Sequence, residues 1–165
     1  MIKQSKISVR HLVEFILRRG SIDNRKKSNH TALEGARIHR KLQKDAGENY
    51  EKEVFLKTTV QLDEYHLIVE GRADGIFKRD GIYYIDEIKT SEPRFEDLEP
   101  EQVELFFHQA RVYAYIYSQE HDLQEINLQL TYFQTAEEVI TRKVEHQTRE
   151  QLETFFKKLT EDYKE

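Results

Sequence analysis

Two carboxylates and one lysine in the centre of the sequence have the types and the spacing of a metal site. Asp74 lies on one predicted strand, and Glu87 and Lys89 lie on the next. The dipeptide Asp80-Gly81 between them is typical of a two-residue hairpin turn. With that turn Asp74 falls opposite Glu87, and side-chain alternation puts Lys89 on the same face. Facing carboxylates repel unless a cation lies between them, so the pattern predicts a bound metal ion.

The same register places two neighbouring residues. Arg72 falls opposite Lys89, and we expect it to contact phosphate. Asp86 competes with Glu87 as the acidic residue, but alternation turns it to the other face. A bulge at Gly81 would shift the register by one residue and bring Asp86 to the metal face. A simpler alternative is a surface hairpin in which Lys89 forms an ion pair with a carboxylate.

The rest of the chain must supply the elements that hold this hairpin. Apolar spacing, capping residues and turn residues predict helices over about Val9–Arg19, Thr31–Asp45, Pro100–Glu120 and Arg149–Tyr163. Strands are predicted over about Glu53–Leu62, His66–Lys78, Ile82–Thr90, Ile126–Phe133 and Val139–Glu145. The order ααβββαββα predicts an α/β fold, with a central mixed β-sheet flanked by helices. Ser8 is the expected cap of the first helix.

Composition limits the class of protein. A length of 165 residues predicts a single domain over residues 1–165 with a sizeable core. The absence of cysteine excludes disulfides and a cysteine-bound zinc or iron–sulfur site. There is no apolar run long enough to span a membrane and no secretory signal at the start, so we expect no membrane partner and a cytoplasmic location. The segment 71–75 lacks the features of a phosphate-binding loop, so no nucleotide cofactor is expected.

The charge is divided unevenly along the chain. Residues 1–45 contain 12 Lys and Arg against 4 Asp and Glu, whereas the remainder contains 14 against 27. A basic first third on an acidic body favours a protein that contacts phosphate with one surface. The basic run Arg25-Lys-Lys27 is equally compatible with an ordinary solvated loop.

Two further pairs of residues lie four apart on predicted helices. Gly35 and His39 share a face of the second helix, and Gln109 and Tyr113 share a face of the third. By spacing alone, His39 would be an ordinary exposed histidine and Tyr113 a core residue. Together with Asp74 and Glu-x-Lys, however, these pairs form a recognisable set.

That set resembles the PD-(D/E)XK nuclease superfamily, and within it the RecB-like exonuclease branch. The match is closest to the N-terminal nuclease domain of some bacterial XPD/DinG-like helicases, and it runs from Ile7 to about Tyr117. It implies a restriction-endonuclease-like core and a Mg²⁺ or Mn²⁺ ion held by His39, Asp74, Glu87 and the carbonyl of Ile88. Lys89 would then be catalytic beside Asp74 and Glu87.

The resemblance also implies a substrate and partners. Gln109 and Tyr113 would position the nucleic-acid backbone, and Arg72 and Arg111 would contact phosphate. We therefore expect a metal-dependent DNA nuclease, in particular an exonuclease acting on single strands or DNA ends in DNA repair, recombination or phage- or helicase-linked processing. A helicase in cis or in trans is the expected partner. The alternatives are a non-catalytic module that docks a helicase onto nucleic acid, and a nuclease that acts on RNA or within strands.

Overall fold

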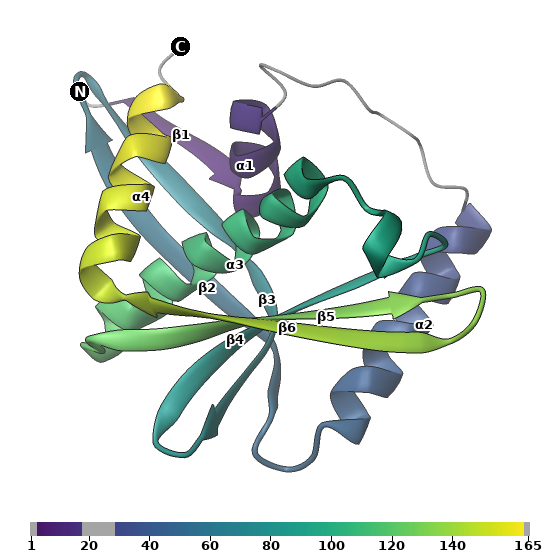
Figure 1. Ribbon diagram of the computed structural model, residues 1–165. Coiled ribbons are helices and arrows are strands. Elements are labelled where there is room, and N and C mark those ends of the chain that lie inside the picture. Colours follow the sequence, from purple (N-terminus) through teal and green to yellow (C-terminus); the bar gives the residue numbers. More distant parts are fainter. Residues whose placement is uncertain (1–2, 18–28, 164–165) are drawn as a thin grey trace.

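The structure, a computed structural model, describes residues 3–17 and 29–163 (Figure 1). Its helices are α1 (Val9–Leu17), α2 (Asn29–Asp45), α3 (Pro100–His121) and α4 (Arg149–Asp162), with a 3-10 turn η1 (Phe95–Asp97). Its strands are β1 (Lys3–Ser8), β2 (Glu51–Leu62), β3 (Tyr65–Arg79), β4 (Ile82–Ser91), β5 (Glu125–Gln134) and β6 (Val139–Thr148).

The strands form one mixed six-stranded sheet. The order is β1-β3-β4-β5-β6, and β2 pairs with β3 outside this path. The β1–β3 and β4–β5 pairs are parallel, and the other pairs are antiparallel. The α/β fold with a central mixed sheet flanked by helices is therefore confirmed.

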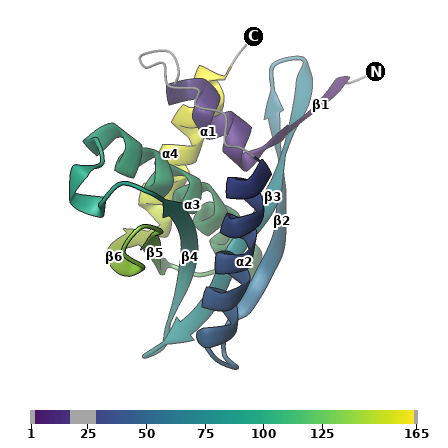
Figure 2. The ribbon, with the colours of Figure 1, turned by 90° about the vertical axis from the view of Figure 1, so that its right-hand side faces the viewer.

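The helices divide into two groups around the sheet. The buried helix α3 packs on β4 and β5, and α1 and α4 pack against α3. Helix α2 contacts β3 and β4, and Figure 2 shows it standing apart from α3 and α4. The core between α3 and the sheet is aliphatic and aromatic, including Leu12, Val69, Ile85, Ile116 and Leu128. None of the helices in the described ranges is long and apolar enough to cross a bilayer.

The expected elements are present with slightly different ends, and one strand was missed. The sequence of β1, KQSKIS, has almost no apolar residues, so its pattern gave no strand signal. It is a strand because its backbone pairs in parallel with the first half of β3. The N–H of His11 donates to the side chain of Ser8, which confirms the expected cap of α1. The expected end of that helix at Arg19 and the loop after it lie outside the described residues.

The hairpin that places the site has the predicted turn. Asp80 and Gly81 both have positive φ values, 52° and 82°, as a two-residue type I′ turn requires. The ladder between β3 and β4 has the expected register, but it ends at the Gly75–Asp86 pair. The expected pairings of Asp74 with Glu87 and of Arg72 with Lys89 are therefore not part of it. Beyond Asp86, β4 continues as the partner of β5.

Candidate metal and catalytic site

The site begins where β3 and β4 separate. Because the ladder stops at Gly75, the N–H of Ile88 has no main-chain partner on β3. It donates instead to the side-chain Oδ2 of Asp74, at 2.7 Å. The side chain of Asp74 thus spans the opening between the strands. This places a carboxylate beside the main chain of Ile88, whose carbonyl is one of the predicted metal ligands.

Glu87 and Lys89 lie on the same face of β4, as predicted. Nζ of Lys89 is 3.0 Å from Oε2 of Glu87, and their side chains are only 16% and 7% exposed. The ammonium group also lies 5.4 Å from the ring centroid of Phe106 on α3. The lysine is therefore held between an acid and an aromatic ring, in a partly dry position where its charge acts strongly.

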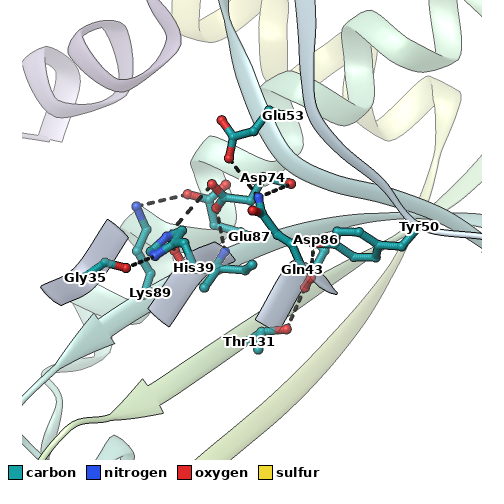
Figure 3. Close-up of polar contacts among 11 residues, drawn as sticks. Gly35, His39, Gln43, Tyr50, Glu53, Asp74, Asp86, Glu87, Lys89 and Thr131 are labelled. Atoms are coloured by element: carbon teal, nitrogen blue, oxygen red, sulfur yellow. Dashed lines mark hydrogen bonds and ion pairs between the residues drawn. The ribbon is translucent and has the colours of Figure 1, made fainter. Parts of the chain in front are cut away.

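His39 reaches this opening from α2. Its Nδ1 is 2.9 Å from the carbonyl of Gly35, and its Nε2 is 2.8 Å from the carbonyl of Ile88. Nε2 also lies 3.9 Å from Oδ1 of Asp74 (Figure 3). An element far from β4 in sequence therefore brings an imidazole nitrogen to the same point as the Asp74 carboxylate.

Both ring nitrogens of His39 face backbone carbonyl oxygens. A neutral imidazole donates from only one ring nitrogen. If Nδ1 donates to Gly35, the lone pair of Nε2 faces the oxygen of Ile88, and a proton or a cation must lie between them. Metal-binding histidines commonly donate their other ring N–H to a backbone carbonyl, which is the contact that Gly35 offers.

The donor set fits a hard divalent cation. It offers two carboxylates, an imidazole and a carbonyl, and oxygen-rich sets of this kind suit Mg²⁺, while an added imidazole favours Mn²⁺. The 2.8 Å between Nε2 of His39 and the oxygen of Ile88 is close to the roughly 3 Å expected between adjacent ligands of an octahedral ion. Across residues 3–17 and 29–163, no group of three or more His, Asp or Glu side chains is placed so that side chains alone could hold a metal ion. The backbone oxygen of Ile88 is thus an integral part of the set.

The electrostatics of Asp74 also favour a cation. Burial, followed by the neighbouring Glu87 carboxylate, raises the pKa of Asp74 well above its usual range. The N–H of Ile88 and the ammonium of Lys89 act in the opposite direction and do not outweigh the first two. A buried pair of carboxylates with only one lysine nearby carries surplus negative charge, which a divalent ion would neutralise.

Two further residues, Gln43 and Glu53, meet at the edge of the site through the side-chain amide of Gln43. Nε2 of Gln43 donates to Oε2 of Glu53 at 2.7 Å and to the carbonyl of Asp74 at 2.8 Å. Gln43 is 4% exposed and lies one helical turn after His39, a spacing that would have revealed it. Glu53 has a φ of 52°, which a non-glycine residue adopts at a cost in energy.

Two glycines of the predicted motifs allow close approach of their neighbours. A Cβ at Gly35 would lie 3.1 Å from Oγ1 of Thr90, so this glycine lets α2 approach β4. A Cβ at Gly71 would lie 2.6 Å from the hydroxyl oxygen of Tyr113. Gly71, three residues before Asp74, therefore lets α3 approach β3 closely.

The α3 residues of the predicted set are both buried. Tyr113 and Gln109 are 8% and 4% exposed and lie one turn apart on the same face of the helix. Burial, followed by the charges of Glu87 and Asp74, raises the pKa of the Tyr113 hydroxyl above its ordinary value. Tyr113 is thus near the carboxylates, and its hydroxyl stays protonated as a hydrogen-bond donor.

The two predicted phosphate contacts are placed elsewhere. Arg111 binds the side chains of Glu104, His108 and Glu145, and its own side chain is 12% exposed. Two residues along a helix turn the side chain to the far side, so Tyr113 faces the site and Arg111 does not. The guanidinium of Arg111 is occupied by these side chains, and its assignment as a phosphate contact stays a prediction. Arg72 is exposed on β3, and in the ladder it pairs with Phe55 of β2, not with Lys89.

Asp86 faces away from the site, as alternation predicted. Its carboxylate accepts hydrogen bonds from Tyr50 at 2.7 Å and Thr131 at 2.6 Å (Figure 3). It also accepts one from Gln129 at 3.1 Å. A carboxylate with three donors is satisfied without a metal. Adjacent acids of β4 thus have separate roles, and the register excludes the alternative in which a bulge exchanges them.

Comparison with known proteins shows the family of this chain. The family model described as the PD-(D/E)XK nuclease superfamily matches residues 8–165. This chain belongs to that superfamily. Membership implies nuclease activity on a nucleic-acid substrate, and such nucleases typically use divalent metals.

Among solved structures, the PD-(D/E)XK chain is similar to the crystal structure of SSO0001. The TM-score is 0.61 and the identity 18%, and the alignment covers 94% of this chain and 75% of the other. At this identity the likeness shows the fold alone. A search of curated proteins finds no significant match.

Proposed function

We propose that this PD-(D/E)XK chain is a metal-dependent deoxyribonuclease of the RecB-like branch. The observation that carries the proposal is the meeting of the Nε2 of His39, the Ile88 carbonyl and the Asp74 carboxylate at the opening between β3 and β4. Helix α2 and both strands of the β3–β4 hairpin supply these atoms, and a structural ion pair would not need all of them.

Each residue has a role that follows from its position. His39, Asp74, Glu87 and the Ile88 carbonyl would hold Mg²⁺ or Mn²⁺. The ion, when bound, activates water and neutralises charge on the phosphate. Lys89 orients the attacking water and donates to the phosphate oxygens, where charge builds up in the transition state. Glu87 holds the ammonium of Lys89 in place, at 3.0 Å.

The outer parts of the site position the strand. Tyr113 keeps its proton and can donate to a phosphate oxygen. Gln109, one turn before it, supports the same side of the site. Arg72 is exposed on β3 two residues before Asp74 and remains available to phosphate.

The finer assignment follows the sequence motifs. The pairs Gly35/His39 and Gln109/Tyr113 are those of RecB-like exonucleases, so we propose exonuclease action on single strands or DNA ends, by one domain over residues 1–165. The setting would be DNA repair, recombination or phage-linked processing, with a helicase in cis or in trans and no membrane partner. A cytoplasmic location is part of this proposal.

The direct test is cleavage of end-labelled single- and double-stranded DNA with Mn²⁺, Mg²⁺ or EDTA. We expect metal-dependent products that shorten from one end. Lys89→Ala should lower the rate by about 100- to 1,000-fold, the usual cost of one donor to the transition state. Far-ultraviolet circular dichroism should show an unchanged fold. Full activity of a folded Lys89→Ala protein would refute the proposed role of the lysine.

A second candidate function is a non-catalytic nucleic-acid-docking module. The close ion pair of Lys89 and Glu87 favours it, because it neutralises one acid without a metal. Calorimetric titration with Mn²⁺ separates the two candidates. A nuclease site binds the ion in the wild type and loses it in Asp74→Asn, whereas a docking module shows no site-dependent binding.

A further inference from the structure

The outer face of α2 carries four cations, with the exposed Leu33 and Asp45 toward its two ends. Arg37, Arg40, Lys41 and Lys44 are all exposed, and their positions along the helix place them on one side. His39 and Gln43 on the same helix point the other way, toward β3 and β4. One face of α2 therefore belongs to the nuclease site, and the other presents a predominantly positive surface.

These four cations have no acidic partner within the described part of the chain. No ion pair joins Arg37, Arg40, Lys41 or Lys44 to a described carboxylate. They are also neighbours three and four residues apart, so their charges repel each other along the helix. By contrast, the exposed face of α4 mixes acidic and basic residues, as an ordinary solvated helix does. A row of positively charged side chains is stabilised by negative charge supplied from outside the chain.

We infer that the outer face of α2 binds the phosphate backbone of the single strand that the nuclease site cuts. This inference rests on the proposed function and names the surface that guides its substrate. From Arg37 to Lys44 the helix rises about 10 Å, the length of roughly three nucleotides at about 3.4 Å each. Figure 2 shows α2 on the outside of the molecule, with nothing in front of it along its length.

The distribution of charge supports a polyanion as the occupant. Residues 1–45 carry a net charge of +8 from Lys, Arg, Asp and Glu, and the rest of the chain carries −13. An acidic body repels a nucleic-acid strand, while the α2 face attracts it. The field therefore directs the strand to the one helix that also carries His39.

The test measures how binding depends on salt. The full chain in EDTA would be titrated onto a fluorescent single strand of about 20 nucleotides, over about 50 to 200 mM salt. The α2 variant is Arg37→Gln, Arg40→Gln, Lys41→Gln and Lys44→Gln together. The matched control changes four exposed cations on other elements: Lys57→Gln, Arg142→Gln, Lys157→Gln and Lys158→Gln. Both variants change the net charge equally.

We expect the α2 variant to lower the slope of log K against log salt by about 2.8, which is about 0.7 for each lost phosphate contact on a single strand. The control should lower the slope by less than about 0.7. An unchanged slope in the α2 variant, or an equal loss in the control, would overturn the inference. Circular dichroism should show that α2 remains folded, since removing like charges relieves repulsion.

Cleavage with metal distinguishes this surface from the nuclease site itself. In the α2 variant, KM should rise by about tenfold or more while kcat stays within about threefold, because these side chains bind the strand in the ground state and transition state alike. A wild-type protein that never cleaves, but whose salt slope depends on α2, would refute the proposed nuclease and keep the binding surface. A loss of kcat with unchanged KM would overturn the inference.

Discussion

The carboxylates of Asp86 on β4 and of Asp74 on β3 have different surroundings. Asp86 has three hydrogen-bond donors. Asp74 has one backbone donor and lies next to Glu87, which together with burial raises its pKa. The first arrangement stabilises the fold, and the second stores unfavourable charge that a bound cation would relieve.

This contrast predicts opposite effects of two conservative substitutions. Asp74→Asn should abolish metal-dependent cleavage and leave the metal-free protein as stable as the wild type or more stable, because it removes a buried charge beside Glu87. Asp86→Asn should keep catalytic residues in place and lower the free energy of unfolding by about 1–3 kcal/mol, since one donor loses its partner. Urea unfolding in EDTA and a cleavage assay measure both. A large loss of stability in Asp74→Asn would contradict the account.

Gln43 is predicted to act through the residues it holds. Gln43→Met keeps the volume and removes both hydrogen bonds of the amide, to Glu53 and to the carbonyl of Asp74. We expect a destabilisation of about 1–3 kcal/mol and weaker binding of Mn²⁺, because helix α2 and its His39 are no longer tied to β3. Calorimetric titration and thermal unfolding check this. Gln43→Met with unchanged metal affinity would limit the residue to a packing role.

At the scale of elements, the site depends on how closely helices approach the sheet. Helix α3 reaches β3 because Gly71 has no side chain where the Tyr113 hydroxyl lies. Helix α2 reaches β4 in the same way at Gly35. Gly35 and Gly71 thus act through packing. A glycine within a helix or strand lowers its stability, and the close contact between elements offsets that loss.

A double-mutant cycle tests the α3 contact. Gly71→Ala should destabilise the protein by about 1–3 kcal/mol, because its new Cβ overlaps the Tyr113 hydroxyl. Tyr113→Phe removes that oxygen, so the double variant should recover part of the loss, with a coupling energy of about 0.5 kcal/mol or more. Chemical denaturation of the four proteins gives the cycle. Additive effects would show that the two residues do not meet.

On the opposite side of α3, Arg111 bridges to Glu145 on β6. The same guanidinium contacts His108, and the titration of this histidine can be measured. Burial, followed by the charge of Arg111, lowers the pKa of His108 from its ordinary 6.5. Its Nδ1 accepts from the guanidinium at 2.7 Å, which only the neutral ring can do. Below pH 6.5 the unfolded chain therefore binds a proton that the folded chain resists, and stability falls as the pH decreases.

The expected outcome is a lower free energy of unfolding at about pH 5.5 than at about pH 7.5, with part of the difference lost in His108→Gln. Glutamine keeps an acceptor for Arg111 and does not titrate. Urea unfolding at the two pH values measures the effect. An equal pH dependence in wild type and His108→Gln would show that this histidine does not contribute.

At the scale of the whole molecule, metal binding should be visible as stability. A ligand at about 100 times its dissociation constant adds about 2.7 kcal/mol to the folded state. For a chain of this size that corresponds to a rise of about 5–10 °C in Tm. We expect Mn²⁺ to raise the Tm of the wild type, EDTA to reverse it, and Asp74→Asn to show no rise. A shift that persists in Asp74→Asn would place the ion elsewhere.

The amino-acid sequence by itself determined the hairpin, its turn and the faces of its acids. Asp80-Gly81 has the positive φ values of a type I′ turn, and with a side-chain period of two this register is local information. The helices and the strands β2, β5 and β6 could be predicted for the same reason, because their apolar spacing is written along the chain.

Tertiary structure alone decided what meets at the site. The strand β1 exists through pairing with β3, and the ladder of β3 and β4 ends at Gly75, while the pairing of β4 with β5 continues beyond it. The contacts of Gln43 depend on which helix packs on which strand, and so does the position of Arg111 beside Glu145, away from the site. Sequence spacing specifies a face of an element, whereas the partner of that face is set by long-range packing, which no local pattern encodes.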